Sequence, residues 1–496
     1  MKKNSLLFIV LFIFCLNVKG QWVSPGDGST FTMQDLVTAS NGAVISVATD
    51  SFSIVQDITI SENDLLSLTD DVTSISVEDV SVLVKGSLIA DISEGKVLTI
   101  NAVSDDFSLR FEYASLEMTN VAISKCGGIK LIETEAVISN CEFSYFTTKD
   151  SNGAFDVFKC DPSVINCYFH DNQGAGITSG ANIQGSPKIV GCVFERNVLS
   201  NINMPQINLG PGAQDSIFIV GNTIIGGVSN MSGGISISDV LGTGSTKALV
   251  KDNIVKDNRY GYNQQGQTIS SRIVGNRFID NNLEVNPMNG GSGISIYGAS
   301  TECKALIRNN IVSGNLWGVT AIYYHDIDLG TEEDYGNNYI FGNGFDGTLY
   351  ELYNNAFSDL SAVGNWWGTA DADEVEDRIY HKNDDASLGL VTFAPFLTED
   401  GCNELSTNDY VLYPNPMDAV LRIEGDMVVS VTVFDVSGRK LIECHNTSSV
   451  DVSALESGVY LVRVVGDNDA TMAKVVKRYC LSIVFCSIDS NLCVER

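Results

Sequence analysis

Short apolar runs recur along most of the chain in one repeated phrase, which extends from Ile138 to Trp367. The phrase reads apolar-x-x-(Cys/Asn)-x-apolar-x-x-(Asn/Gly), and its central residue, here called the anchor, recurs every 23 to 34 residues. This spacing is typical of a solenoid, in which each repeat buries its apolar face against the next. The anchors are Cys141, Cys167, Cys192, Asn222, Asn253, Asn276, Asn310, Asn338 and Asn365.

The apolar runs are short, β-branched and interrupted by Gly and Asn, which favours strands over helices. Alternation is clearest at Gly234-Ile235-Ser236-Ile237-Ser238 and at Gly293-Ile294-Ser295-Ile296-Tyr297, where one set of side chains faces inward and the other outward. No leucine-rich consensus is present. The pattern therefore predicts an all-β chain that forms a right-handed parallel β-helix, with about three short strands per coil.

The anchors form one column in the predicted solenoid. Asparagine tolerates the left-handed backbone of a tight corner, so we expect the anchor itself to take that conformation. Its amide would then donate a hydrogen bond to the carbonyl of the neighbouring coil. A second column, five residues after the anchor, holds Asn172, Asn197, Asn258, Asn281, Asn315 and Asn343. We interpret the cysteine anchors as small apolar fillers; a disulfide or a metal site is the alternative.

The chain begins with the features of a secretory signal peptide. Residues 1–20 carry Lys2 and Lys3 before an apolar stretch from Leu6 to Leu16, which is too short to span a bilayer. Residues 21–53 are expected to cap the open end of the solenoid. We assign residues 54–400 to the β-helix with its C-terminal cap, and no other segment has the length of a transmembrane span.

The solenoid is predicted to close at Gly364-Asn365-Trp366-Trp367-Gly368. This phrase and the acidic, helix-like stretch after it resemble the end of many bacterial β-helix proteins of the pectate-lyase-like superfamily. We interpret both indoles as an apolar lid, with a sugar-stacking platform as the alternative. The acidic residues Asp371, Asp373 and Glu374 fit the start of a helix better than a metal site.

The last ordered series of motifs lies near the C-terminus, after a polar linker at residues 401–410. The motifs are Tyr413-Pro414-Asn415-Pro416, Val433–Arg439 with Gly438, Asp451–Val462 with Gly458 and Tyr460, and Lys474–Lys477. The series resembles the C-terminal sorting domain of the Bacteroidota type IX (Por) secretion system, and this resemblance implies export by that machinery. Strands separated by Pro-Asn-Pro and Ser-Gly turns predict a small antiparallel β-sandwich over 411–478. An atypical tail, 479–496, departs from the family.

The chain is strongly acidic. With 30 basic and 61 acidic residues, its formal charge is −31, which argues against nucleic acid or an anionic membrane as a partner. Eleven of the twelve cysteines follow the predicted signal peptide. Their odd number and lack of paired spacing argue against a disulfide framework, and no cofactor is evident.

The best local constellation for binding is Tyr323, Tyr324, His325 and Asp326, which precedes further acidic residues. It is suited to a polysaccharide or cell-surface glycan through the tyrosines, or to calcium through oxygen ligands. The alternative is a solvated acidic loop. We expect the connections from Asn281 to Ile307 and from Asn315 to Tyr335 to border one cleft, in which Tyr323 or Tyr324 is exposed.

No residue has the context of a catalytic group. The Arg-x-Pro-x-x-Arg phrase of pectate lyases and the Gly-His-Gly phrase of polygalacturonases are absent, and His170 has the position of a corner residue. The sequence favours a secreted or cell-surface protein, attached to the outer membrane, that binds glycan or extracellular matrix without catalysis. A divergent polysaccharide lyase, hydrolase or epimerase is the alternative. Converging acidic, basic and tyrosine side chains in one groove would favour the enzyme.

Overall fold

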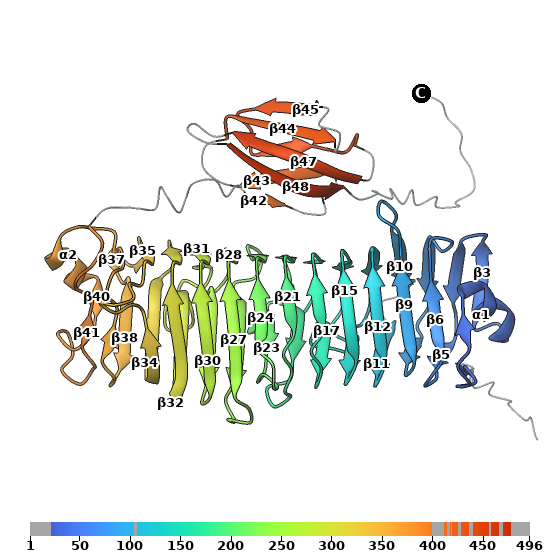
Figure 1. The fold of residues 1–496 in the computed structure, drawn as a ribbon, viewed down its shortest axis with the longest axis horizontal. Helices are drawn as coiled ribbons and strands as arrows, with labels where there is room; N and C mark the ends of the chain where they lie inside the picture. Colours follow the sequence, from blue (N-terminus) through green and yellow to red (C-terminus); the bar gives the residue numbers. More distant parts are fainter. Residues whose placement is uncertain are drawn as a thin grey trace, which may run out of the picture.

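A computed structural model of the chain describes residues 21–103, 107–398, 411–413, 417, 419–424, 428–435, 440–455, 458–465 and 470–477. The predicted signal peptide, the linker and the atypical tail lie outside these residues. The described chain forms a long parallel β-solenoid and a small antiparallel domain (Figure 1).

The solenoid is a parallel β-helix with three faces, because each coil places one strand on each face. Faces one and two together make a 26-stranded sheet, and face three is a 13-stranded sheet. Face one contains β1 (Gln21–Val23), β5 (Asp57–Ile60), β8 (Ser81–Val84), β11 (Ser108–Glu112), β14 (Ile129–Ile132), β17 (Gly153–Phe158), β20 (Ala175–Ser179), β23 (Met204–Leu209), β26 (Ser232–Asp239), β29 (Tyr262–Gly266), β38 (Leu352–Ala356) and β40 (Ile379–Tyr380).

Face two contains β2 (Thr30–Phe31), β6 (Leu65–Leu68), β9 (Ser87–Asp91), β12 (Ser115–Thr119), β15 (Glu135–Ser139), β18 (Ser163–Ile165), β21 (Lys188–Val190), β24 (Ile217–Val220), β27 (Thr246–Lys251), β30 (Ile269–Val274), β39 (Leu360–Ser361) and β41 (Val391–Thr392). Two long strands run across both faces: β32 (Ser292–Arg308) and β34 (Trp317–Asp328). Face three contains β3 (Val44–Ala48), β4 (Ser51–Ile54), β7 (Ser74–Val77), β10 (Leu98–Ala102), β13 (Val121–Ser124), β16 (Glu142–Ser144), β19 (Tyr168–His170), β22 (Val193–Glu195), β25 (Thr223–Ile225), β28 (Ile254–Lys256), β31 (Arg277–Ile279), β33 (Ile311–Ser313) and β35 (Tyr339–Phe341).

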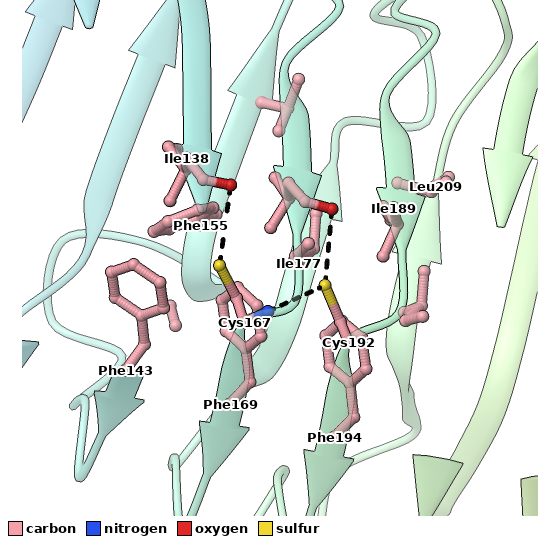
Figure 2. Close-up of a cluster of buried hydrophobic side chains, with 14 of the residues drawn as sticks. Ile138, Phe143, Phe155, Cys167, Phe169, Ile177, Ile189, Cys192, Phe194 and Leu209 are labelled. Carbon is pink, nitrogen blue, oxygen red and sulfur yellow. Dashed lines mark hydrogen bonds between the residues drawn. The ribbon is translucent and has the colours of Figure 1, made fainter. Parts of the chain in front are cut away.

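One continuous hydrophobic core fills the solenoid from Met33 to Val391. In-register pairing stacks equivalent side chains in columns, as in the run Phe143, Phe169 and Phe194 (Figure 2). Neighbouring ring centroids in this run lie 4.9 Å apart, close to the strand spacing of roughly 4.8 Å. No coil can bury these rings alone, so the repeat itself specifies stacking.

The corners correct one prediction. The left-handed residue is not the anchor but the residue before it, for example Asn166 (φ 52°), Asp252 (φ 55°) and Gly275 (φ 70°). The anchor that follows points its side chain into the solenoid, because Cys167, Asn253 and Asn276 are buried. The corner therefore needs two adjacent residues: one takes the left-handed backbone conformation, and the side chain of the other forms hydrogen bonds with the preceding coil.

The asparagine ladder is confirmed. Asn276 Nδ2 donates to the carbonyl of Val250 in the preceding coil at 2.9 Å, and its Oδ1 accepts from Asn253 N at 3.0 Å. The same bonds link the anchors from Asn222 to Asn365. The second column forms a parallel ladder, seen at Asn281 and Asn315. These amides satisfy backbone groups that no water reaches.

The cysteine anchors are free thiols, so no disulfide joins the described ones, as the sequence predicted. They do more than fill space. Cys192 Sγ donates to the carbonyl of Val164 at 3.4 Å and accepts from Cys167 N at 3.4 Å (Figure 2). The thiol thus occupies the same two bonding positions as the amide in later coils.

Both ends of the solenoid are closed by short elements. At the start, β1 pairs with β5 and β2 pairs with β6, so residues 21–53 supply strands of the first coil as well as helix α1 (Met33–Ala39), which buries Met33 and Leu36. At the other end Trp367 is fully buried in the main core. Trp366 differs from the prediction: it packs outside face three in a separate cluster with Ile311 and Tyr339.

The predicted helix start after the tryptophans is confirmed. Helix α2 (Ala372–Asp377) begins behind the N-cap Asp371, whose side chain accepts from the backbone N–H groups of Asp373 and Glu374. A short hairpin, β36 (Gly344–Phe345) with β37 (Thr348–Leu349), lies beside the last coils.

The C-terminal domain consists of two antiparallel sheets around a second core. One sheet contains β42 (Val411–Tyr413), β43 (Val420–Glu424) and β46 (Ser449–Asp451); the other contains β45 (Lys440–His445), β44 (Ser430–Asp435), β47 (Gly458–Val465) and β48 (Ala470–Lys477). Tyr460 is buried in this core. Among the predicted motif residues, Pro414, Asn415, Pro416 and Gly438 lie outside the described residues.

Candidate functional site

The predicted tyrosine site lies on β34. The side chains of Tyr323 and Tyr324 are 49% and 50% exposed, and Tyr323 makes an edge contact with Tyr297 of β32 at 5.1 Å between ring centroids. His325 does not join them, because it is buried and its Nε2 lies 3.4 Å from Asn354 Oδ1. Asp326 is exposed beside Lys304 at 3.3 Å. Of the four predicted residues, Tyr323 and Tyr324 are therefore exposed side by side in the chain, Tyr323 contacts Tyr297, and His325 is withdrawn into the core.

The connection that carries these tyrosines is strand β34, which differs from the alternative of a solvated acidic loop at Tyr323–Asp326. Residues Trp317–Asp328 pair along β32 with a register shift between Ala299 and Lys304. This pairing makes the two predicted connections neighbours. Tyr323 adopts a left-handed backbone (φ 60°) at the place where β34 turns from face one to face two.

Face one places hydroxyl and amide side chains in a single outward column beside the tyrosines. Cross-strand pairing aligns them one per coil, between the buried residues of each strand. The column consists of Thr178, Asn208, Ser236, Asn263, Ser295 and Thr320. Asn208, Asn263 and Ser295 are half-buried and so reach the surface, and Asn263 Nδ2 donates to Ser236 Oγ at 3.0 Å.

Aromatic side chains continue this column toward the C-terminal end. Thr320 pairs with Tyr353, and Tyr353 pairs with Tyr380. The Tyr353 ring stacks on Trp317 at 4.9 Å and on Tyr380 at 4.7 Å, with interplanar angles of 12° and 5°. Face one therefore changes from hydroxyl and amide groups to aromatic rings within a few coils.

Two of the acidic residues after the tyrosines, Asp328 and Asp334, are held by one arginine. Arg308 Nη2 donates to Asp328 Oδ2 at 2.8 Å and to Asp334 Oδ2 at 3.0 Å. The predicted calcium site draws on the same carboxylates. Among the residues that the structure describes, no group of three or more His, Cys, Asp or Glu side chains is arranged to hold a metal ion.

A second cluster, which the sequence analysis did not identify, lies on face three. Tyr168 donates to Glu195 Oε2 at 2.5 Å, and His170 lies between Asp171 (2.7 Å) and Glu142 (3.2 Å). Arg196 binds Asp171 through Nε and Nη2, both at 2.9 Å, and also contacts Glu195. We call these six residues the face-three ion network.

The protonation states of this network are set by its own contacts. Burial alone would lower the pKa of His170, but its hydrogen bonds to Asp171 and Glu142 and their negative charges raise the pKa to about 9. Burial and the neighbouring Glu195 raise the pKa of Tyr168. At neutral pH the imidazole is therefore positively charged and the phenol neutral, so neither is ready to accept a proton.

The network is also covered. Tyr168, His170 and Glu195 are buried, and Arg422 of the C-terminal domain lies 3.8 Å from Glu195. We predicted that an enzyme would bring acidic, basic and tyrosine side chains together in one groove. The network contains these three types of side chain, but they are buried and a substrate could not reach them. The sequence contains a signal for this cluster, because residues at the same offset from their anchors align on neighbouring coils. Tyr168 and Glu142 stand one residue after their anchors, and His170 and Glu195 stand three residues after theirs.

No helix among the described residues is long and apolar enough to cross a membrane.

Comparison with known families gives two partial matches. Residues 411–478 match the secretion system C-terminal sorting domain (Por), and residues 262–372 match a family of unknown function, DUF1565. No curated protein matches the chain by sequence. Two crystal structures of the periplasmic alginate epimerase AlgG, one of the unmodified protein and one of a double mutant, are similar at 11% identity. Their TM-scores are 0.43 and 0.45, and each alignment covers 74% of this chain and 81% of that chain.

The family match and the topology agree with the motifs of the C-terminal region. Such a domain implies handling by the type IX secretion machinery and transport across the outer membrane. The protein is a parallel β-helix that carries a C-terminal Por secretion sorting domain.

Proposed function

We propose that the solenoid is a secreted or cell-surface module that binds a glycan on face one without catalysis. The observation that carries this proposal is the exposed pair Tyr323 and Tyr324 on β34, where Tyr323 contacts Tyr297 and the preceding Thr320 pairs with Ser295. Aromatic rings offer apolar area at low entropic cost, and hydroxyl and amide groups fix orientation.

The geometry of face one suits an extended polymer. Its side chains repeat once per coil, at roughly 4.8 Å along the solenoid axis. Asn208, Asn263 and Ser295 would bond successive hydroxyl groups of a sugar chain that runs along that axis. The tyrosines would cover the apolar face of a ring at its end. Retention on the outer membrane would then present this surface to the outside.

Binding to a glycan array and titration calorimetry on the strongest hit test the proposal. The variant Tyr323→Asn/Tyr324→Ala removes both rings, with Asn at the left-handed position because it tolerates that backbone. We expect Kd to rise by at least about tenfold, or about 1.4 kcal/mol. Unchanged affinity would contradict the assignment.

Tyr113→Asn is the matched control. Tyr113 is also left-handed (φ 54°) and is 68% exposed, but it lies at the N-terminal end of the solenoid. Its variant should bind like the parent protein, and both variants should melt at nearly the parent temperature.

The alternative is a divergent polysaccharide lyase, hydrolase or epimerase, which the convergence of Tyr168, His170 and Arg196 favours. The saturated hydrogen bonding of these groups weighs against it. Product analysis of the same glycan decides between them. New chain ends or altered sugars that disappear in Tyr168→Phe would replace the binding proposal with the enzyme.

A further inference from the structure

Face two carries a surface whose charge is opposite to that of the whole chain. Along β21, β24, β27, β30 and residues Lys304–Arg308 of β32, which pair with β30, no Asp or Glu occurs; Glu302 precedes the paired part of β32. Apart from Ser270, the exposed outward residues of these strands are cations: Lys188, Lys247, Lys251, Arg272 and Lys304. In a chain of net charge −31, five exposed cations on four of five consecutive coils are a marked local excess.

Apolar side chains occupy the centre of the same surface. Register pairing places Phe218 beside Leu249 and Val220 beside Lys251, with Arg272 next along the first of these columns. The apolar members are half-buried although they point outward: Val190, Phe218, Val220, Leu249, Val274 and Leu306. We call the cations and these apolar residues together the face-two patch. In Figure 1 its strands lie in the middle of the solenoid, from green to yellow.

The cations of the patch are available to a partner. Lys188, Lys247 and Arg272 form no ion pair with any residue that the structure describes. Lys251 and Lys304 contact Asp252 and Asp326 at 3.3 Å, but all four side chains are well exposed, so these pairs are weak. The described residues of the C-terminal domain leave these cations exposed, and their contact with Glu195 is on face three.

We propose that the face-two patch docks the protein on a lipid surface with anionic headgroups. A flat array of cations around apolar side chains matches the boundary between charged headgroups and acyl chains. A soluble polyanion would pair the cations but leave six apolar side chains in water. The sorting domain implies transport across the outer membrane, so the protein reaches such a surface.

The net negative charge of the chain does not prevent this contact. It determines the orientation of the protein on the lipid surface. Repulsion from the other faces is screened over about 8 Å at physiological ionic strength, whereas the patch touches the headgroups directly. The acidic remainder of the solenoid would point away from the lipid, which leaves face one open. The composition alone argued against an anionic membrane because it averages over these faces.

Co-sedimentation of the purified protein with phosphatidylcholine vesicles, with and without phosphatidylglycerol, tests the proposal. The parent protein should bind only the vesicles that contain phosphatidylglycerol, and added salt should weaken binding. Lys247→Glu/Arg272→Glu should bind at least about tenfold more weakly, because two contacts with headgroups become repulsive. Lys125→Glu/Lys382→Glu makes the same change in net charge at exposed lysines outside the patch and should bind like the parent.

A second variant examines the apolar part. Phe218→Ser/Leu249→Ser keeps every cation and should also lose several-fold in vesicle binding, with a melting temperature near that of the parent. Parent-like binding by this variant would mean a simple polyelectrolyte contact and overturn the proposal. Binding to dextran sulfate without binding to vesicles, equal binding to neutral vesicles, or parent-like binding by Lys247→Glu/Arg272→Glu would overturn it as well.

Discussion

Two segments of the solenoid use different side chains to bond equivalent corners of successive coils. From β15 to β22 the anchor column holds cysteines above a stack of phenylalanines; from β24 to β35 it holds asparagines. In both segments the anchor side chain bonds the carbonyl of the preceding coil and accepts the N–H of the preceding anchor. Cys192 does so at 3.4 Å on each side, and Asn253 does so at 2.8 and 2.9 Å.

The difference shows how stability is divided between polar bonds and packing. An amide bonds strongly and adds a side-chain contact to the next amide, as in Asn222 Nδ2 to Asn253 Oδ1 at 2.9 Å. A thiol is a weak donor but a good apolar filler. The cysteine segment is the one with stacked Phe143, Phe169 and Phe194, so aromatic packing accompanies the weaker bonds there.

The largest expected effect is in the asparagine segment. Asn276→Leu leaves the carbonyl of Val250 and the two N–H donors of Asn253 without partners in the core. Each buried unpaired group costs about 1–3 kcal/mol, so we expect a loss of about 3–5 kcal/mol in the free energy of unfolding. Urea denaturation measures it.

Asn289→Leu is the control for that experiment, because Asn289 is exposed on the loop before β32. It should cost less than about 0.5 kcal/mol. Equal denaturation midpoints for the two variants would show that the ladder does not support the solenoid.

A second effect lies where the other amide ladder ends. The buried Glu351 accepts from Asn343 Nδ2 at 2.7 Å and from two backbone N–H groups, and its burial raises the pKa to about 7 from 4.5. The folded chain therefore binds this proton more tightly than the unfolded chain. Stability from this group is complete below about pH 4.5 and falls as the pH rises through about 7, by roughly 3 kcal/mol in all.

Denaturation of Glu351→Gln across this pH range provides the measurement. The variant should lose the decline between pH 5 and 8 that the parent shows. Glu94→Gln, at an exposed position, should keep the parent profile. A parent profile in Glu351→Gln would show that the second ladder does not end on an ionisable group.

The smallest effect sharpens the comparison itself. Cys192→Asn extends the amide ladder by one coil, since Cys192 N already donates to Asn222 Oδ1 at 2.8 Å. We expect a change within about 1 kcal/mol of the parent, because stronger hydrogen bonds offset lost apolar contact with the phenylalanine stack. Cys192→Ala removes both and should cost about 1–2 kcal/mol. If both variants lose the same free energy of unfolding, the hydrogen bonds of residue 192 make no difference, and the thiol stabilises the solenoid only by filling space.

The comparison also explains which features could be predicted from the chain. The anchors, the second ladder, the free cysteines and the helix start at Asp371 follow from local spacing, and the structure confirms them. The left-handed residue lies one position before the predicted one, because Asn suits either of two adjacent corner positions. Trp366 and Trp367 are adjacent, but their side chains lie on opposite sides of the backbone, so only Trp367 enters the main core.

The three faces differ in how far the sequence determines them. The residues of faces two and three stand at constant offsets from the anchors. The sequence by itself therefore determined that Lys188, Phe218, Leu249 and Arg272 align. It determined the alignment of the face-three ion network in the same way. Face one follows corners of variable length: Asn208 stands 16 residues after its anchor and Asn263 stands 10 after its own. Only the tertiary structure decided that these side chains share one column, because the core residues of each strand, not the loop before it, set the register.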